Sequence, residues 1–387
     1  MTIGAEVGAT ATHVAVRDAA GDLDLHSGGG EPAPVLDRLR ATDSTGDAVL
    51  AVPASWYAAG GATERERVCR LLAEHGWTVR SVVPRWAAAV AALSTRKSAR
   101  DGTVLAGELA PDGVTFALAR VDHDVIEALE PAPVTVPMSR ELRRLATAAA
   151  NAPDRGGARR ASVLLARARG VPRYRDTPVY RVADTPTAGE ALDAFAPVAA
   201  AIAQCAARPA AAGVERVLLD GPLAAFPLVE QAIRAASPGW GRAEFTRTET
   251  GAAASGALLL AEGRYTAPRP APYSVHLPVR RVRAGLLVSD RLRLTRAGDE
   301  PQVSPGASAV TVRVPEGDHR PIVVEVDDGP GAPAQIEVAA SRLPAGSYRV
   351  GLWPVDAGPG VLAFRPDGPG PPILVPLPNP QGGSRGR

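Results

Sequence analysis

The spacing of hydrophobic and polar residues changes near residue 265, which divides the chain into two parts. Before that point, short apolar runs alternate with stretches in which apolar residues recur every three or four positions. The clearest helical stretch is TERERVCRLLAEHG (63–76), where Thr63 and Glu66 form a predicted capping box and Gly76 a predicted stop. The repeated strand–helix order predicts an α/β domain with helices packed on the faces of its sheets.

Within the first part, the same pattern predicts individual elements. Two short strands flank a tight turn at Gly8, and the apolar run before Gly221 predicts a buried strand followed by a helix. The three glycines at 28–30 predict a flexible turn, with a phosphate-binding nest as the alternative. The other predicted strands cover 48–55, 77–83, 103–109 and 114–121. The predicted helices cover 63–76, 86–93, 138–150, 157–168, 187–208, 224–236 and 249–262.

The second part of the chain has the pattern of an all-β domain. A proline-rich segment at 264–274 predicts a stiff, extended linker. Seven short alternating runs follow, separated by turn segments such as PEGD and LPAGS, and they predict an antiparallel sandwich or barrel over 275–378. The last residues, 379–387, predict a disordered tail.

Composition excludes several classes of function. The net charge is only +2, and no basic run is interleaved with aromatic residues, so we expect no nucleic-acid partner. The most apolar long stretch, 194–213, contains two prolines, Gln204 and Arg208, so we expect no insertion into a membrane. The N-terminus lacks the pattern of a signal peptide, and Cys69 and Cys205 stand far apart. These features predict a soluble, cytoplasmic protein.

The short motifs of common enzymes are missing from the sequence. There is no phosphate-binding GxxxxGK[ST], because Lys97 is the only lysine and has no such glycine frame before it. HExxH, GxSxG and paired-cysteine metal spacings do not occur, and no two of the six histidines stand at ligand spacing. Function must therefore be inferred from the order of longer segments.

That order resembles the nucleotide-binding domain of the Hsp70 family, within the actin-like ATPase fold. IGAEVGATATHVAV looks like the first phosphate loop of that family, a hairpin with an acidic residue before its glycine turn. The segment from AVLAVPAS to WAAAVAAL resembles the family's stretch from VPA to the helix EPTAAAL. VLAGELAPDGVTFALARV stands where the second phosphate loop is expected. VERVLLDGPLAAFPLVEQAI and TGAAASGALLLAEG look like the adenosine-contacting segment and the closing helix.

The resemblance covers about 1–263 and implies a two-lobed domain with an insertion near 122–212, followed by a peptide-binding β-sandwich. It implies ATP or ADP as ligand, with magnesium held through water by an acidic residue in each loop. By position, Glu6 and Glu108 would be these metal-facing residues. The implied nucleotide-binding set is Glu6, Gly8, Thr10, Glu108, Gly113, Thr115, Gly221 and Gly256.

Departures from the family pattern point to a degenerate site. Glutamate replaces aspartate at both metal-facing positions, and Pro111 in the second loop has no N–H to donate to a phosphate. Pro84 or Arg85 falls where the glutamate before a helix is expected, and the family's catalytic lysine has no counterpart. Phosphoryl transfer depends on positioned charge, and each lost group costs about 10²-fold or more. We therefore expect no efficient ATP hydrolysis and no catalytic residue.

Three hypotheses follow from the sequence. The first is an Hsp70-like protein with a degenerate ATP site, acting as an adaptor that binds a protein or peptide partner. The second is a genuine ATP-binding chaperone that uses the C-terminal β domain for peptides. The third is an actin-like scaffold that forms filaments. If the predicted residues meet around one site filled by Leu223 or Pro111, the first hypothesis is favoured.

Overall fold

The structure is a computed structural model, and it describes residues 2–8, 11–18, 20–40, 45–57, 62–94, 101–130, 133–151, 155–267, 274–295, 311–316, 322–327, 334–338, 343–355, 358–368 and 370–377. Over these residues the chain is a mixed α/β protein with eight α-helices and 19 strands in four sheets. It divides into two compact units, Met1–Ser55 with Leu71–Pro268 and Trp56–Arg70 with Arg269–Arg387.

The first unit begins with a five-stranded sheet. Its strands are β1 (Thr2–Val7), β2 (Ala11–Arg17), β3 (Leu23–Gly29), β4 (Gly46–Val52) and β5 (Trp77–Pro84), in the order β3-β2-β1-β4-β5. The central strands β1, β4 and β5 run parallel, whereas β2 and β3 form an antiparallel meander at one edge. The first two helices of the chain are α1 (Ala33–Arg40) and α2 (Ala62–Glu74). Gly76, with φ +85°, lies just beyond α2 and suits the predicted helix stop.

A second sheet of the first unit repeats this mixed arrangement. Its strands are β6 (Gly102–Ala110), β7 (Gly113–Asp122), β8 (Val125–Ala128), β9 (Val134–Val136), β10 (Val214–Asp220) and β11 (Glu244–Arg247). The order is β11-β10-β6-β7-β8, and β9 pairs with β7. The hairpin of β6 and β7 is nearly the predicted one, and β10 runs parallel to β6 beside it.

Two apolar helices, α3 (Arg85–Ser94) and α8 (Ala252–Ala261), connect the two sheets. α8 contacts β1 and β4 of the first sheet, while α3 contacts β6 and β10 of the second. Glycines make this packing possible. A Cβ at Gly256 would come within 1.7 Å of the Ala88 carbonyl oxygen, and a Cβ at Gly4 would come within 2.1 Å of the Leu258 amide nitrogen. The backbones of β1, α8 and α3 therefore approach more closely than larger residues would allow.

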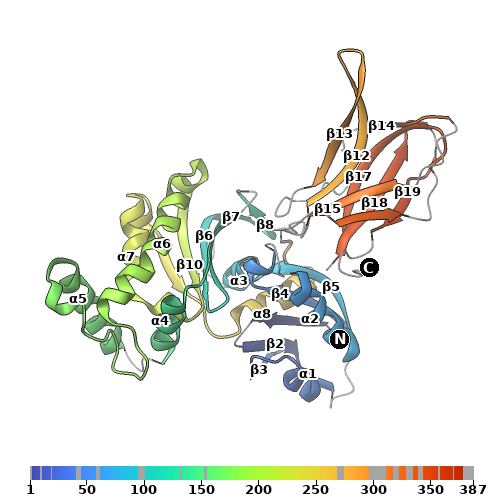
Figure 1. Cartoon of the computed structure of the whole chain (residues 1–387). Coiled ribbons are helices and arrows are strands. Elements are labelled where there is room, and N and C mark those ends of the chain that lie inside the picture. The colour runs from blue at the N-terminus through green and yellow to red at the C-terminus, as the bar shows by residue number, and fades with distance from the viewer. Residues whose placement is uncertain are drawn as a thin grey trace, which may run out of the picture. The chain divides into compact units, whose positions relative to one another are not determined.

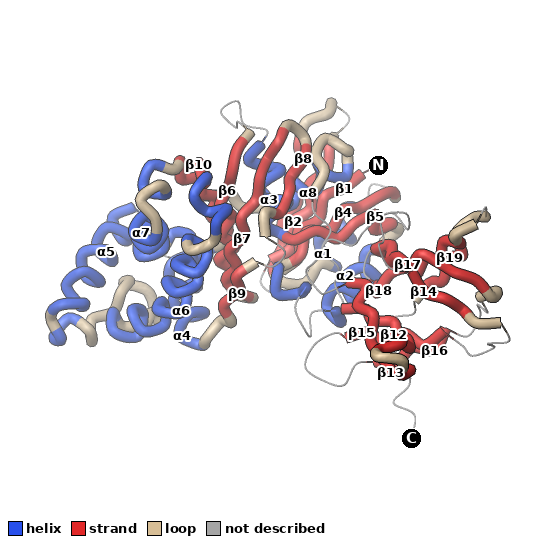
Figure 2. The backbone as a smooth tube through the Cα atoms, turned by 90° about the horizontal axis from the view of Figure 1, so that it is seen from above, coloured by secondary structure: helices blue, strands red, loops and turns tan. Residues whose placement is uncertain are grey.

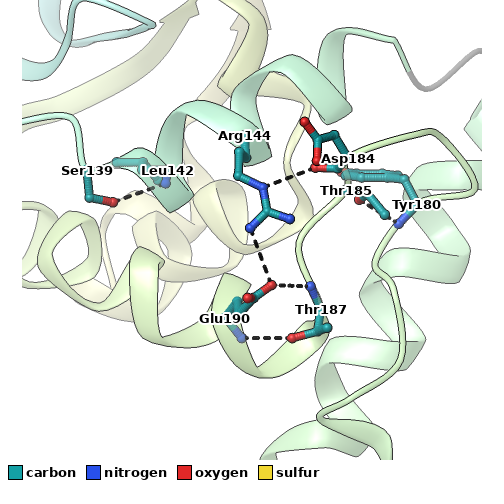
Figure 3. Close-up of polar contacts among 8 residues, drawn as sticks. All are labelled: Ser139, Leu142, Arg144, Tyr180, Asp184, Thr185, Thr187 and Glu190. Carbon is teal, nitrogen blue, oxygen red and sulfur yellow. Dashed lines mark hydrogen bonds and ion pairs between the residues drawn. The ribbon is translucent and has the colours of Figure 1, made fainter.

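The other four helices of the first unit gather beside the second sheet, as Figure 2 shows. They are α4 (Arg140–Ala150), α5 (Arg155–Gly170), α6 (Ala188–Ala206) and α7 (Pro227–Ala236). One apolar core joins them to β6, β7 and β10, with Phe116, Phe195 and Phe226 fully or almost fully buried. A capping box starts α6, in which Thr187 and Glu190 bond each other's backbone N–H; Arg144 of α4 reaches the same Glu190 carboxylate at 3.8 Å (Figure 3).

The second unit contains two antiparallel sheets of four strands each, and Figure 1 shows them in orange and red. One sheet has the order β13-β12-β15-β16, with β12 (Ser274–Arg283), β13 (Leu286–Thr295), β15 (Ile322–Asp327) and β16 (Ala334–Val338). The other has the order β14-β17-β18-β19, with β14 (Thr311–Val314), β17 (Gly346–Val355), β18 (Gly358–Pro366) and β19 (Ile373–Pro376). Both sheets contribute buried side chains to one apolar core.

Several details differ from the predictions or lie outside the described residues. α2 begins at Ala62, so Thr63 lies inside the helix instead of capping it. The flexible turn predicted at 28–30 is wrong for Gly28 and Gly29, because both pair with β2 as the end of β3. Thr266 of the predicted linker is hydrogen-bonded to both Asp124 and Ile126 around β8. Residues 268–273 and the predicted tail 379–387 lie outside the described residues.

Candidate functional site

The candidate site lies where parallel strands of both sheets end. Glu6 is near the carboxyl end of β1, and Asp220 is the last residue of β10. Glu108 of β6 is the direct neighbour of Asp220 in the parallel ladder. Carboxyl ends of parallel strands are where open α/β sheets usually place their ligands. Local strand patterns thus bring three acidic residues from separate segments to one region.

An arginine occupies the centre of this acidic group. Arg85 directly follows β5, starts α3, and has a side chain that is only 7% exposed. Its Nε lies 3.3 Å from Oε1 of Glu6 and its Nη1 lies 3.4 Å from Oε1 of Glu108. Its Nη2 lies 3.6 Å from Oδ2 of Asp112, in the turn between β6 and β7. One guanidinium therefore joins acidic residues from both sheets. We call Arg85, Glu6, Glu108, Asp112 and Asp220 the Arg85 cluster.

Negative charge exceeds positive charge within this cluster. The cluster contains four carboxyl groups and a single guanidinium, and the side chains of Glu108 and Asp112 are 2% and 7% exposed. A buried carboxylate is stable only when it is paired and hydrogen-bonded, so one cation does not offset four ionised groups. Glu108 has one further partner, the backbone N–H of Ala54 at 3.3 Å. The Asp220 carboxylate accepts a hydrogen bond from the hydroxyl of Thr248.

Burial accordingly shifts the protonation of the cluster. Burial raises the pKa of Glu6 to about 7, and the nearby Arg85 only partly opposes that rise. Burial raises the pKa of Glu108 to about 8, and the charge of Asp112 adds to the effect. Burial disfavours the charged form of Arg85, but its acidic neighbours outweigh this and hold its pKa above the ordinary value. The cluster therefore retains protons near neutral pH, on the glutamates and on the arginine.

His13 belongs to the same region and was not predicted. It lies on β2 directly across from Glu6 and is 8% exposed. Its Nδ1 is 2.8 Å from the hydroxyl of Ser27. Burial and then the charge of Arg85 lower the pKa of this imidazole. The sequence did contain a signal for His13. A histidine on an apolar strand needs a polar partner, and an acidic residue on the paired strand is one of the few available.

The residues predicted for the phosphate loops lie close to the Arg85 cluster. A Cβ at Gly8 would come within 2.2 Å of Nη2 of Arg85, so this glycine makes room for the guanidinium. Thr115 is buried and lies directly across the β6–β7 ladder from Glu108. Gly113 ends the turn, and a Cβ there would make ordinary contact with Ser55. Thr10 lies outside the described residues.

The two glycines predicted to face adenosine are explained by packing. Gly221 has φ +94°, and a Cβ there would come within 2.6 Å of the Leu109 carbonyl oxygen. Gly256 faces α3, where the Ala88 carbonyl takes the space beside it. Leu223 is fully buried in the core beneath α4 to α7, and Pro111 is only partly buried, so the filling group at the cluster is Arg85.

The arrangement of the cluster does not fit a magnesium-bound triphosphate. Magnesium demands near-octahedral oxygen ligands at about 2.0–2.1 Å, and here a guanidinium already engages oxygens of Glu6, Glu108 and Asp112. A triphosphate would add further negative charge to a cluster in which acidic groups already outnumber the single cation. No catalytic step involving these ligands follows from the geometry.

One further acidic group includes a histidine. Asp101, Asp122 and His123 place their ligand atoms within 4.8 Å of one another, and all three are exposed. Antiparallel pairing of β6 and β7 brings Asp101 close to Asp122 and His123, which are neighbours in the sequence. The group contains only one histidine, so the spacing of histidines along the sequence did not reveal it. Nδ1 of His123 lies 2.8 Å from Oδ2 of Asp101, and this raises the pKa of the imidazole. An exposed ion pair accounts for the group.

No protein-family model matches the sequence, and no curated protein matches it either. Over the part of the chain that the structure describes, none of the helices has the length and apolar character needed to cross a bilayer.

Proposed function

We propose that the protein is an Hsp70-like, nucleotide-independent binding module whose former ATP site is held together by Arg85. The resemblance assigns Glu6 and Glu108 to magnesium, and it expects a glutamate where the chain has Pro84 or Arg85. The observation that carries the proposal is the position of the Arg85 guanidinium, within 3.3–3.4 Å of both glutamates. The positively charged side chain of an arginine lies where the resemblance leads us to expect a metal ion.

Electrostatics support the same conclusion. An exchangeable Mg²⁺ has to compete with a guanidinium that is part of the fold and that pays no loss of translational freedom on contact. Burial also keeps Glu6 and Glu108 partly protonated near neutral pH, which weakens them further as metal ligands. Both effects oppose the binding of a magnesium nucleotide.

Under this proposal, protein binding belongs to the second unit. We interpret its two antiparallel sheets, which share one core, as a β-sandwich that follows the nucleotide-type domain in the order the resemblance implies. The expected ligand is an extended peptide or a protein surface. Without a nucleotide cycle, binding and release would depend on concentration and affinity alone.

Calorimetry and a turnover assay test the loss of nucleotide function. Titration of the full chain with ATP and Mg²⁺ to millimolar concentration should give no heat of binding, and phosphate release should not exceed the protein-free blank. An active Hsp70-type ATPase in the same buffers serves as the positive control. Steady phosphate release at the rate of that control would refute the proposal and support an ATP-driven chaperone.

A second experiment addresses peptide binding separately. Fluorescence anisotropy of a labelled, permanently unfolded reporter, such as reduced and carboxymethylated lactalbumin, should rise on addition of the chain. The rise should be identical with and without Mg-ATP. Release of the reporter by Mg-ATP would favour the chaperone hypothesis, and a constant anisotropy would show that unfolded polypeptide is not the ligand.

A further inference from the structure

The second unit carries a long two-stranded ribbon. β12 and β13 pair from Val275 to Arg283, and the described pairing of β12 with β15 covers only Ser274 to His276. Ala284 and Gly285 close the ribbon with positive φ angles of 50° and 79°, which suits a tight hairpin turn. Figure 1 shows the ribbon of β12 and β13 extending beyond the other strands of this unit.

Large apolar side chains are concentrated at the free end of this ribbon. Val282, Leu286 and Leu287 are 71%, 70% and 61% exposed, the three highest values among the large hydrophobic residues described. Val282 and Leu287 are ladder partners and share one face, whereas Leu286 lies opposite Arg283 and therefore on the other face. Each face of the tip thus carries at least one exposed large apolar side chain. Single exposed apolar side chains are ordinary, but three at one projecting tip mark a binding element.

The ribbon is also strongly basic. Residues 274–295 contain five arginines and one aspartate, with no lysine or glutamate. Arg280 is exposed, and it lies two residues before Val282 on the same face, about 7 Å along the strand. Arg291 and Arg293 are exposed on that face as well, roughly 13 and 20 Å from Leu287. Arg291 also contacts Glu325.

We propose that this tip, Val282 to Leu287, docks the protein peripherally onto an anionic membrane surface. Apolar side chains on a surface-bound element enter about 5–10 Å into the boundary between headgroups and acyl chains. At that depth, Arg280 lies level with the lipid phosphates, and arginines further back add attraction to an anionic surface. A protein pocket would have to enclose both faces of the ribbon end. A fluid lipid interface accepts such a convex tip without a matching shape, so the geometry favours lipid.

Co-sedimentation with vesicles tests the proposal with the full chain. The wild type should sediment with vesicles of mixed phosphatidylglycerol and phosphatidylcholine, and added salt should weaken this binding. The double variant Leu286→Asp/Leu287→Asp should bind at least tenfold more weakly, and Arg280→Gln should bind several-fold more weakly with a smaller salt dependence. Leu374→Asp is the matched control, because Leu374 is an exposed leucine on β19 and should not affect binding.

Several results would overturn the proposal. These are no wild-type binding to anionic vesicles, equal binding to pure phosphatidylcholine, or unchanged binding of the tip variant. Dimerisation of the wild type without vesicles, measured by light scattering and lost in the tip variant, would instead identify a second copy of the chain as the occupant. The substituted side chains are exposed, and far-UV circular dichroism checks that each variant is folded.

Discussion

Glu108→Gln tests whether the buried Arg85 cluster sets the pH dependence of stability. Glutamine has nearly the same size as glutamate and can still accept the Ala54 backbone N–H at this position. It cannot ionise. The substitution therefore removes the titration of the most deeply buried carboxyl group of the cluster while it leaves the Glu6 and Asp112 contacts of Arg85 in place.

The expected magnitude follows from the pKa shift of Glu108. In the unfolded chain the carboxyl group titrates near its ordinary value of 4.5, whereas burial raises the folded pKa to about 8. The folded state therefore binds more protons between these values. Its stability advantage is complete below about pH 4.5 and is lost as the pH rises through about 8. The full effect is about 1.4 kcal/mol per pH unit, and Glu108 is half-ionised at pH 8, so its titration lowers the stability of the wild type by roughly 2 kcal/mol between pH 6 and pH 8.

Glu6 adds a smaller loss in the same direction, because its folded pKa is about 7. This contribution remains in Glu108→Gln. The free energy of unfolding of the variant should therefore still fall between pH 6 and pH 8, but by roughly 2 kcal/mol less than that of the wild type. Glu127→Gln, at an exposed position of β8, should run parallel to the wild type.

Urea denaturation at pH 6, 7 and 8 measures how the free energy of unfolding changes with pH. Circular dichroism at 222 nm reports mainly on the first unit, because all described α-helices except part of α2 belong to it. The slope with urea should be equal for all three proteins, so that midpoints report stability. A wild-type stability that is constant or rises from pH 6 to pH 8 would show that burial does not control Glu108. An equal change of stability with pH in wild type and variant would also show that burial does not control Glu108.

Two further substitutions test the packing and the helix start. Gly256→Ala places a Cβ within 1.7 Å of the Ala88 carbonyl oxygen and should lower the free energy of unfolding in urea by about 3 kcal/mol or more. Gly241→Ala, with open space around it, should be near neutral. Equal effects of the two substitutions would contradict the close contact of α3 and α8. Thr187→Ala removes the capping box of α6 and should cost about 1 kcal/mol in thermal denaturation, compared with the exposed Thr177→Ala. A result no larger than this control would count against the cap.

The sequence was most informative where local chemistry alone determines an element. The predicted strands 103–109 and 114–121 correspond to β6 and β7, because the apolar runs flank a Pro-Asp-Gly turn. The predicted helix 187–208 corresponds to α6, because Thr187 and Glu190 cap it. Strands β3, β8, β9 and β11 were missed, since β3 is largely exposed and the other three have only three or four residues. Their pairing partners, and not their own pattern, make them strands.

The site required information that spacing along the chain does not contain. The sequence identified Glu6 and Glu108 as a pair and noted Arg85 as a departure from the family pattern. It did not indicate that Arg85 points between them. The spacing of apolar residues along a helix does not determine where the side chain of its first residue points. The direction depends on how α3 packs against α8, which Gly256 allows, and on how α8 packs against β1, which Gly4 allows.

If the site is a former ATP site, as proposed above, Arg85 also explains why it still contains acidic residues. Loss of metal binding alone would leave buried glutamates without a counter-ion, and an unpaired buried charge costs several kcal/mol. Arg85 supplies that counter-ion from α3. Its contacts with Glu6 of one sheet and Glu108 of the other join the two sheets. In the family that the chain resembles, phosphates gripped by two loops make this connection. Under the same proposal, the guanidinium has that structural role, and the connection between the two sheets needs no ligand.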